Sequence, residues 1–418
     1  MATKEILFPS GVNRRLSFRQ ETGRREQYFS PWAVNCRLED FRGRLRGGSF
    51  VPPSVSSPPA TQSATLTDAN GNYFVNVIGN GGSSVSTVTG NASSHSGGVI
   101  YAPTPASGGP PVHPAQCVYR DRLFVPNGKV VNVSRMGAYS DWSLSSDFSD
   151  LSRPTVMQLS EAGEIGKDIV ALIPHKDAVL LAATSDSLWV LRGDPVAEGS
   201  LRNISRHVGM IGPKAWCRDH LDNYFFLSRY GLYAVSASGE GLQAISEDVI
   251  PEHLVNVSDQ DTTLTYDHGS KSVYVRIPGS SVSWMYDIDN QGFWPFKSGV
   301  GSHVAIGPIR LGDGNSYGRL IQLHGMTAAG SVNVTWRIML ADTAEQVAIN
   351  AKSIIDSLTG NGGSSSGVHS TGVWTPGVNH RSYPRARGKY MMLILSANSG
   401  NWAWEGASAV IMPSGAWR

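Results

Sequence analysis

The feature that most constrains the fold is a recurrence of short apolar runs that do not alternate with polar residues. In residues 223–235, NYFFLSRYGLYAV, two such runs flank a short polar loop that ends at Gly231. Side chains of a strand point alternately to two faces, so a hairpin with one face in water should alternate apolar and polar residues. This hairpin barely alternates. Both of its faces must therefore be covered by other parts of the protein.

Groups of about four such runs recur along the chain at irregular intervals. Residues 169–191 hold three runs, residues 214–246 hold four and residues 263–296 hold four more. Radially arranged four-stranded sheets are the blades of a β-propeller, whose inner strands are covered on both faces by neighbouring blades. A face-to-face β-sandwich would instead leave one face of each strand in water and alternating. The sequence predicts an all-β fold, a β-propeller of roughly five or six irregular four-stranded blades.

The composition and the turn residues divide the chain into three segments. Charged residues make up 16%, below the roughly 25% of average globular chains, and glycine and proline are abundant, which favours turns and short strands. We expect an Arg-rich N-terminal arm with the first strands in residues 1–52, and a projecting β-loop insertion rich in Ser, Thr, Gly and Pro in residues 53–114. The propeller follows in residues 115–418, with a helix and a Gly/Ser loop inserted at about 345–372.

Two helices and one hairpin carry local signals. An apolar stripe predicts an amphipathic helix, formed by Val347, Ala351, Ile354, Ile355 and Leu358. Ser246, followed by acidic residues, is typical of the N-cap of a short helix in residues 246–254. Asn70-Gly71 is the dipeptide of a tight hairpin turn and lies inside the predicted insertion.

Charge is concentrated at the N-terminus. The formal net charge is +2, but residues 1–50 contain ten Lys and Arg against five acidic residues. Such a cluster can bind phosphates or pair with carboxylates of another subunit, and the acidic residues interleaved with it favour the protein partner. A second group of arginines precedes a strand near residue 390. We therefore predict partner-binding roles for Arg14, Arg15, Arg19, Arg24, Arg25, Arg42, Arg44, Arg46, Arg381, Arg385 and Arg387.

Three motifs resemble catalytic or metal-binding sites, but the residues around each of them do not fit such a site. Ser365 stands in a G-x-S-x-G pattern, but Gly/Ser loop surrounds it where a nucleophile elbow needs a strand and a helix. Residues 287–292, DIDNQG, start like a calcium loop but lack the carboxylate at position twelve, so a turn between two strands is the better interpretation. Residues 217–220, CRDH, offer two metal ligands where zinc needs three or four, which favours a buried cysteine and a surface histidine.

No enzyme is predicted from these residues. The turn motif common in sialidase-type propellers is absent, as are a Walker loop and an HExxH motif. We expect no catalytic residue, no metal and no cofactor. The start lacks the pattern of a signal peptide, and no apolar run approaches the length of a membrane span, so we expect a chain without a membrane-spanning segment that is made in a cytoplasm.

Three stretches together resemble a known family. They are residues 35–50, residues 203–250, which contain NISRHVGMIGPKAWCRDHLDNYFFLSRYGLYAVS and LQAISEDVI, and residues 385–418. LWVLRGDP, and WSLSSD after NVSR, add to the likeness. Their order and spacing resemble the tail nozzle, or tail hub, proteins of short-tailed bacteriophages. Residues 53–111 and 360–372 have no counterpart in that pattern.

The resemblance implies a structural virion protein of the phage tail. Members are β-propeller-bearing subunits of a homohexameric ring at the distal end of the tail, docked on a head-to-tail adaptor ring and holding a needle or tail fibres. Double-stranded DNA passes through without specific binding, so localisation would be the virion tail, after assembly in the host cytoplasm. Two other functions stay open: a propeller module that binds carbohydrate or protein through residues such as Trp284, Trp294 and Trp374, and a propeller hydrolase.

Overall fold

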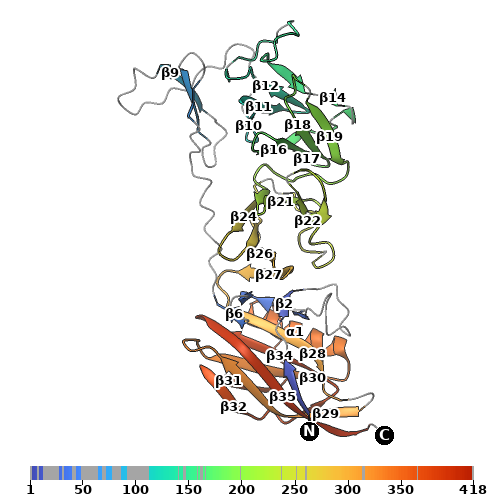
Figure 1. The fold of residues 1–418 in the computed structure, drawn as a ribbon. Coiled ribbons are helices and arrows are strands. Elements are labelled where there is room, and N and C mark those ends of the chain that lie inside the picture. The colour runs from blue at the N-terminus through green and yellow to red at the C-terminus, as the bar shows by residue number, and fades with distance from the viewer. Residues whose placement is uncertain are drawn as a thin grey trace. The chain divides into compact units, whose positions relative to one another are not determined.

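The computed structural model describes residues 2–6, 9–12, 28–30, 33–39, 44–48, 65–67, 72–77, 86–91, 113–139, 141–144, 147–157, 159–160, 163–164, 166–197, 199–236, 238–250, 252–258, 261–312, 316–364 and 366–416. The described part is mostly β-strand, and one α-helix occurs in it, so the predicted all-β class is confirmed. None of the helical structure in this part is long and apolar enough to cross a bilayer. Chain contacts divide the protein into two compact units, and Figure 1 labels elements of each of them. Unit 1 comprises residues 1–51, 248–252 and 267–418, and unit 2 comprises residues 52–247 and 253–266.

Unit 2 contains three four-stranded antiparallel sheets, each made of consecutive strands. The first holds β10 (Cys117–Tyr119), β11 (Arg122–Asn127), β12 (Val130–Val133) and β13 (Thr155–Met157). The second holds β16 (Ile169–His175), β17 (Val179–Thr184), β18 (Leu188–Arg192) and β19 (Ser200–Ser205). The third holds β20 (Trp216–Arg218), β21 (Tyr224–Ser228), β22 (Gly231–Val235) and β23 (Gln243–Ala244). The predicted repeat of four antiparallel strands is confirmed here.

The middle sheet is covered by apolar side chains on both faces. Every residue of β17 is buried. Leu180 and Ala182 pack in one apolar cluster with Phe124 of the first sheet. Leu181 and Ala183 point the other way and pack with residues of the third sheet. A strand between two neighbouring sheets has no wet face, which explains why its sequence does not alternate.

The hairpin that introduced this question behaves in the same way. β21 pairs with β22 from Tyr224 opposite Val235 to Ser228 opposite Gly231. All five residues of β21 are buried. Tyr224 and Phe226 belong to the cluster shared with β16–β18, and Phe225 and Leu227 are buried on the opposite face.

Smaller sheets complete unit 2. β14 (Leu159–Ser160) pairs with β15 (Gly163–Glu164). β7 (Thr65–Thr67), β8 (Asn72–Val77) and β9 (Ser86–Asn91) form a three-stranded antiparallel sheet. The hairpin predicted inside residues 53–114 is therefore present, although Asn70 and Gly71 themselves lie outside the described residues.

Unit 1 begins with strands that extend the repeat. β24 (Thr263–Asp267) crosses the boundary between the units, and its sheet continues through β25 (Ser272–Arg276), β26 (Val282–Asp287), β27 (Gly292–Lys297), β2 (Pro9–Val12) and β3 (Tyr28–Ser30). The antiparallel strands β25, β26 and β27 thus gain two strands from the N-terminal segment, β2 paired antiparallel with β27 and β3 paired parallel with β2.

Two larger sheets form the rest of unit 1. The five-stranded sheet runs in the order β31 (Val368–Trp374), β30 (Val334–Ala341), β34 (Tyr390–Ala397), β28 (Ser302–Arg310) and β4 (Ala33–Val34). The seven-stranded sheet runs β32 (Gly377–Ser382), β29 (Ser316–Thr327), β35 (Trp402–Ala416), β6 (Arg44–Gly47) and β5 (Cys36–Glu39), with β1 (Ala2–Ile6) on β35 and β33 (Ala386–Gly388) on β29.

These two sheets share one apolar core, which differs from the predicted repeat. Leu393 and Leu395 of one sheet cluster with Leu320, Leu323 and Ala409 of the other. β29 alternates buried and accessible residues along much of its length, because one of its faces covers the core and the other is exposed. Residues 302–416 therefore contain two facing sheets, in which strands distant in sequence pair with each other, and not four-stranded units of consecutive strands.

The helix α1 (Ala344–Leu358) covers the outer face of the five-stranded sheet. Its buried residues Val347, Ala351, Ile354 and Ile355 pack against Met392 and its neighbours, so the predicted apolar stripe is confirmed. The prediction of a short helix in residues 246–254 is wrong, because the described residues there form bends and turns. Ser246 is buried, and its hydroxyl accepts a hydrogen bond from the backbone N–H of Leu232 at 2.9 Å instead of capping a helix.

Candidate functional site

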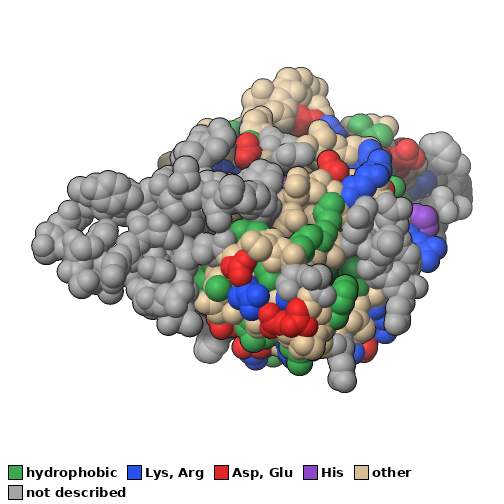
Figure 2. All heavy atoms as spheres, turned by 90° about the horizontal axis from the view of Figure 1, so that it is seen from above, with side chains coloured by type: hydrophobic (Ala, Val, Ile, Leu, Met, Phe, Trp, Pro, Cys, Tyr) green, Lys and Arg blue, Asp and Glu red, His purple; other side chains and the backbone are tan. Residues whose placement is uncertain are grey.

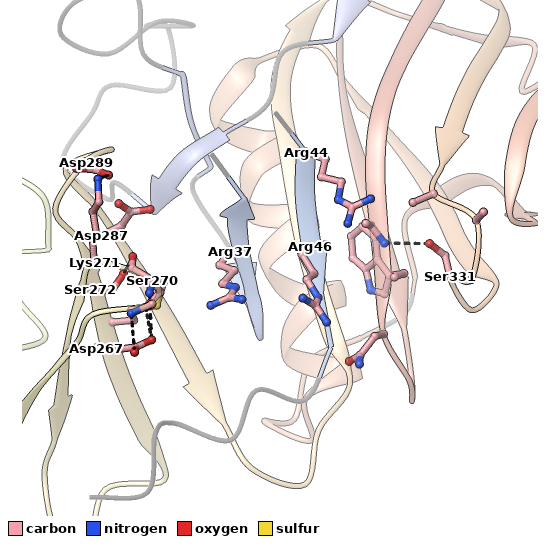
Figure 3. Close-up of a pocket in the computed structure, with 18 residues that line it drawn as sticks. Arg37, Arg44, Arg46, Asp267, Ser270, Lys271, Ser272, Asp287, Asp289 and Ser331 are labelled. Carbon is pink, nitrogen blue, oxygen red and sulfur yellow. Dashed lines mark hydrogen bonds and ion pairs between the residues drawn. The ribbon is translucent and has the colours of Figure 1, made fainter. Parts of the chain in front are cut away.

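A cavity of about 1020 Å³ lies within unit 1 and joins residues from distant parts of the sequence. One wall is the β5–β6 hairpin, and another consists of the loops after β24 and β26. The connection between β29 and β30 and the start of β35 complete the lining. Figure 3 shows the arginines of the hairpin on neighbouring strands and the aspartates on the loops opposite them.

The basic wall follows from the alternation of the β5–β6 hairpin. Cys36, Leu45 and Gly47 point into the core of unit 1 and are buried. Arg37 and Arg46 are directly opposed in the antiparallel register, and both line the cavity. This wall therefore carries like charges at directly opposed positions of the hairpin.

Arg44 also lines the cavity and lies beside a carboxylate of β35. Its Nη1 lies 3.5 Å from Oε1 of Glu405 on β35. The arginine side chain is 15% exposed. Glu405 is 37% exposed, so water partly screens the pair, and pairs of exposed charges are worth about 1 kcal/mol or less.

Asn35 fixes the hairpin in place. Its φ of 54° is unusual for a residue other than glycine, and asparagine is one of the types that tolerate it. The side-chain Nδ2 donates to the carbonyls of Lys297, Val300 and Gly301 at 2.9–3.2 Å, and Oδ1 accepts from the N–H of Lys297 at 2.9 Å. One buried amide thus ties the start of β5 to the connection between β27 and β28.

Gly47 and Trp402 fix the other side of the hairpin. Gly47 is opposite Trp402 in the pairing of β6 with β35. A Cβ atom at Gly47 would overlap the indole ring, so the ring needs glycine at this position. The indole Nε1 donates to Oγ of Ser302 at 2.6 Å and the ring is buried.

The acidic wall is built from two similar loops. Asp267 ends β24 and accepts hydrogen bonds from Gly269 N and from the backbone and hydroxyl of Ser270, at 2.7–3.3 Å. Asp287 ends β26 and accepts from the backbone and side chain of Asn290 at 3.1 and 2.9 Å. Each loop closes with a non-glycine residue at positive φ, Lys271 or Gln291.

An ion pair bridges the two loops. Lys271 Nζ lies 3.0 Å from Oδ2 of Asp289, and both side chains are about half exposed. The backbone continues the link, since Ile288 N donates to the carbonyl of Lys271 at 3.4 Å. The loops are therefore held together, and the two walls present fixed charges of opposite sign.

The pKa of Asp267 indicates how this wall works. Burial alone would raise the pKa of its carboxyl, but hydrogen bonds from Ser270 and Gly269 and the charge of Arg37 lower it below its ordinary value. Asp267 is thus ionised at neutral pH and suited to binding cations, not to donating a proton. The described lining combines the arginines of the hairpin with Asp267, Asp287 and Asp289 of the two loops.

The structure brings together only part of the predicted partner-binding set. Arg44 and Arg46 line the cavity. Arg385 and Arg387 are exposed at β33, and Arg381 lies in β32, where its side chain is outside the described residues. The remaining predicted residues lie outside the described part of the chain: Arg14, Arg15, Arg19, Arg24, Arg25 and Arg42. The partner-binding role of the whole set stays a prediction.

Two of the motif interpretations are confirmed. Residues 287–292 form the connection of β26 to β27. Cys217 is buried and His220 is exposed, with its Nδ1 2.7 Å from the hydroxyl of Tyr266. Within the described residues, no three His, Cys, Asp or Glu side chains lie close enough to hold a metal ion. Ser365 lies outside the described residues.

Sequence reasoning missed the acidic wall and its supports. The sequence indicates a turn at Asp287 and Asp289, but it assigns no site role to Asp267 or Asn35. The one available signal was the recurrence of Asp at the start of two loops that both precede apolar strands, DHGSK and DIDNQ. Such a recurrence predicts similar turns, but their proximity depends on the sheet register.

Comparison with known proteins adds no family. No protein-family model and no curated protein matches the sequence. Among solved structures, the dihydro-heme d1 dehydrogenase NirN in complex with DHE is 13% identical, with a TM-score of 0.32 over 69% of this chain and 56% of NirN. The extracellular domain of BT4673 from B. thetaiotaomicron is 11% identical, with a TM-score of 0.34 over 67% and 40%. Kluyveromyces lactis Hsv2 is 10% identical, with a TM-score of 0.28 over 63% and 81%. At such scores these likenesses carry no argument about function.

Proposed function

We propose that this chain is a structural virion protein, the tail nozzle or hub subunit of a short phage tail. In this proposal six copies form a ring at the distal end of the tail. The ring is a conduit for genome ejection and a docking platform for the head-to-tail adaptor, a needle or fibres. The proposal assigns no catalytic step to the chain.

The observation that supports it best is the stack of four-stranded sheets in unit 2. The middle sheet shares one apolar cluster with the sheet before it and another with the sheet after it. We infer that the four-stranded sheets are blades of a β-propeller. Sheets joined through both faces resist bending and leave few free edges, which suits the wall of a tube that must keep its shape during DNA passage.

The surface charge fits passage of DNA without a specific grip. Basic and acidic side chains lie interspersed on the face drawn in Figure 2. In unit 2, for example, Arg135 pairs with Asp141 and Asp150 at 2.8 Å each. Neutralised arginines contribute little to phosphate binding, because affinity for DNA grows with the number of phosphates that free cations neutralise.

Ring contacts would run through the cavity of unit 1. A recess with one basic and one acidic wall accepts a loop of a neighbouring subunit in a single orientation, since the reversed loop would meet like charges. A heterologous contact of this kind closes into a ring when the rotation between subunits divides a full turn.

Measuring the mass of the purified full-length chain tests the proposal. We expect a sixfold ring by native mass spectrometry or mass photometry, and its loss in Arg46→Glu. Arg276→Glu is the matched control, because Arg276 is an exposed strand-end arginine that does not line the cavity. A monomer at every concentration, also with the adaptor ring added, would contradict the proposal. If the Arg42→Glu, Arg44→Glu and Arg46→Glu variants assemble but slow ejection, the arginines face the bore and not a protein.

The cavity also supports a second candidate, a module that binds carbohydrate or protein. A recess of about 1020 Å³ is large enough to hold a small ligand with charged groups at both ends. A tight monomer with saccharide affinity would favour this function. Turnover of a glycoside that is abolished by a single carboxylate substitution would instead show a hydrolase.

A further inference from the structure

The seven-stranded sheet of unit 1 carries a second basic feature on its outer face, formed by residues that do not line the cavity. Arg319 of β29 and Arg387 of β33 are directly opposed in the antiparallel register. Their neighbours Gly318, Leu320 and Ala386 are buried, so both arginines point outward, and both are exposed. Two guanidinium groups at opposed positions repel each other, which weakens the pairing of the two strands.

A tyrosine contacts one of the two arginines, Arg387, and a third cation, Lys389. The guanidinium of Arg387 lies 5.2 Å from the ring centroid of Tyr317, and Nζ of Lys389 lies 5.6 Å from the same centroid. Arg387 Nη2 also donates to the carbonyl of Ser414 at 3.4 Å, which holds its head group over the sheet. Within the described part of the chain, neither Arg319 nor Arg387 forms an ion pair with a carboxylate.

The same face continues into exposed apolar residues. Met412 of β35 is directly opposite Arg319 and is 39% exposed. Further along β29, Met326 is opposite Val378 of β32, and these side chains are 39% and 57% exposed. The surface therefore combines arginine, tyrosine and methionine, the residue types that are enriched where proteins bind proteins. Nucleic-acid surfaces are more uniformly polar and positive.

We propose that this strip, defined by Tyr317, Arg319, Arg387, Lys389 and Met412, binds a segment of a partner protein in which carboxylates alternate with aliphatic side chains. Its carboxylates pair with the opposed arginines and relieve their repulsion, and its aliphatic groups cover Met412 and continue toward Met326. An extended segment matches this surface, because its side chains alternate with the same period of two as those of the sheet. The inference goes beyond the tail assignment and would hold for the chain in any other assembly.

A defined peptide tests the proposal on the full chain. The probe is a fluorescent ten-residue peptide of alternating glutamate and leucine, measured by anisotropy at low and at physiological salt. We expect binding that weakens as salt rises, and at least a tenfold loss of affinity in the Arg319→Glu/Arg387→Glu variant. The matched control is Lys129→Glu/Arg276→Glu, which changes the net charge equally at two exposed cations far from the strip in sequence. The control should retain the affinity of the unmodified chain.

A single substitution separates binding from folding. Arg319→Glu alone converts the opposed like charges into a cross-strand ion pair with Arg387, so it should leave the urea midpoint unchanged or raised while peptide binding falls. The proposal is overturned if the peptide does not bind, or if the control variant loses as much affinity as the strip variant. It is also overturned if a 20-base-pair DNA duplex binds in the peptide's place with the same dependence on Arg319 and Arg387, since the surface would then serve nucleic acid.

Discussion

Replacing Arg122 with methionine should destabilise unit 2 more than any change at an exposed arginine. Arg122 begins β11 and is 0% exposed. Its Nε donates to Oδ2 of Asp194 at 2.8 Å. Nη1 and Nη2 donate to four backbone carbonyls at 2.6–3.1 Å, those of Ser134, Leu151, Ser152 and Arg153. One guanidinium thus satisfies the end of β12, the loop before β13 and the loop after β18.

The magnitude follows from what methionine leaves behind. Breaking a buried ion pair costs about 3–5 kcal/mol because the remaining charge stays buried without its partner. The carbonyl of Ser134 loses its buried donor, which adds about 1 kcal/mol, while the other three carbonyls are partly accessible and can be hydrated. We expect a loss of about 5 kcal/mol of unfolding free energy. That is a large part of the roughly 5–15 kcal/mol of a typical domain.

The assay is urea denaturation of the full chain at pH 7, with hydrogen exchange of the amides of β11 and β12 to assign the transition to unit 2. The double variant Arg122→Met/Asp194→Asn should be more stable than Arg122→Met alone, because it leaves no unpaired buried charge. The asparagine Oδ1 can still accept from the N–H of Val196, as the aspartate does at 2.8 Å. A loss below about 1 kcal/mol for Arg122→Met, or additive effects within about 0.5 kcal/mol, would refute this reasoning.

Two further predictions concern unit 1. Gly47→Ala should lower the unfolding free energy by about 1–3 kcal/mol in a urea titration, because the added Cβ would overlap Trp402. Gly406→Ala is the control and should cost less, since no atom lies near its added Cβ. Equal losses in the two variants would contradict the close packing of Gly47. Burial, together with the charge of Arg337, lowers the pKa of His303 from 6.5 to about 4. The unfolded chain therefore binds a proton at His303 that the folded chain does not, and the unfolding free energy falls by about 3 kcal/mol as the pH drops from 6.5 to about 4. In His303→Gln the unfolding free energy should depend less on pH over this interval. An unchanged pH profile would contradict this assignment.

The four-stranded sheets of unit 2 could be predicted because their signal is local. Apolar runs without alternation, such as residues 224–227, are forced by cover on both faces, and the strands pair with their neighbours in sequence. The helix α1 was predictable for the same reason, since its stripe lies within 15 residues. In these elements the pattern, the partner and the fold are all set within a short piece of chain.

The facing sheets of unit 1 could not be predicted in this way. β35 pairs with β6 and β29, and β28 pairs with β4 and β34, so their partners lie far along the chain. A segment such as residues 44–47 shows only a strand tendency, and nothing local states that Gly47 must receive the indole of Trp402. The cavity depends on these long-range pairings, so its acidic wall and the role of Asn35 could not be predicted from the sequence.

The strand register, and not the position along the sequence, determines which charges lie beside each arginine. Counted along the sequence, Arg44 and Arg46 belong to one basic cluster, yet Arg44 has Glu405 beside it while Arg46 faces Arg37. Arg319 lies in no cluster, but the sheet places it opposite Arg387. Replacing residues 381–387 alone would therefore not remove the charge of the strip, because Arg319 would remain as one of the two opposed arginines. The variant that changes both Arg319 and Arg387 removes both of the opposed charges that the fold brings together.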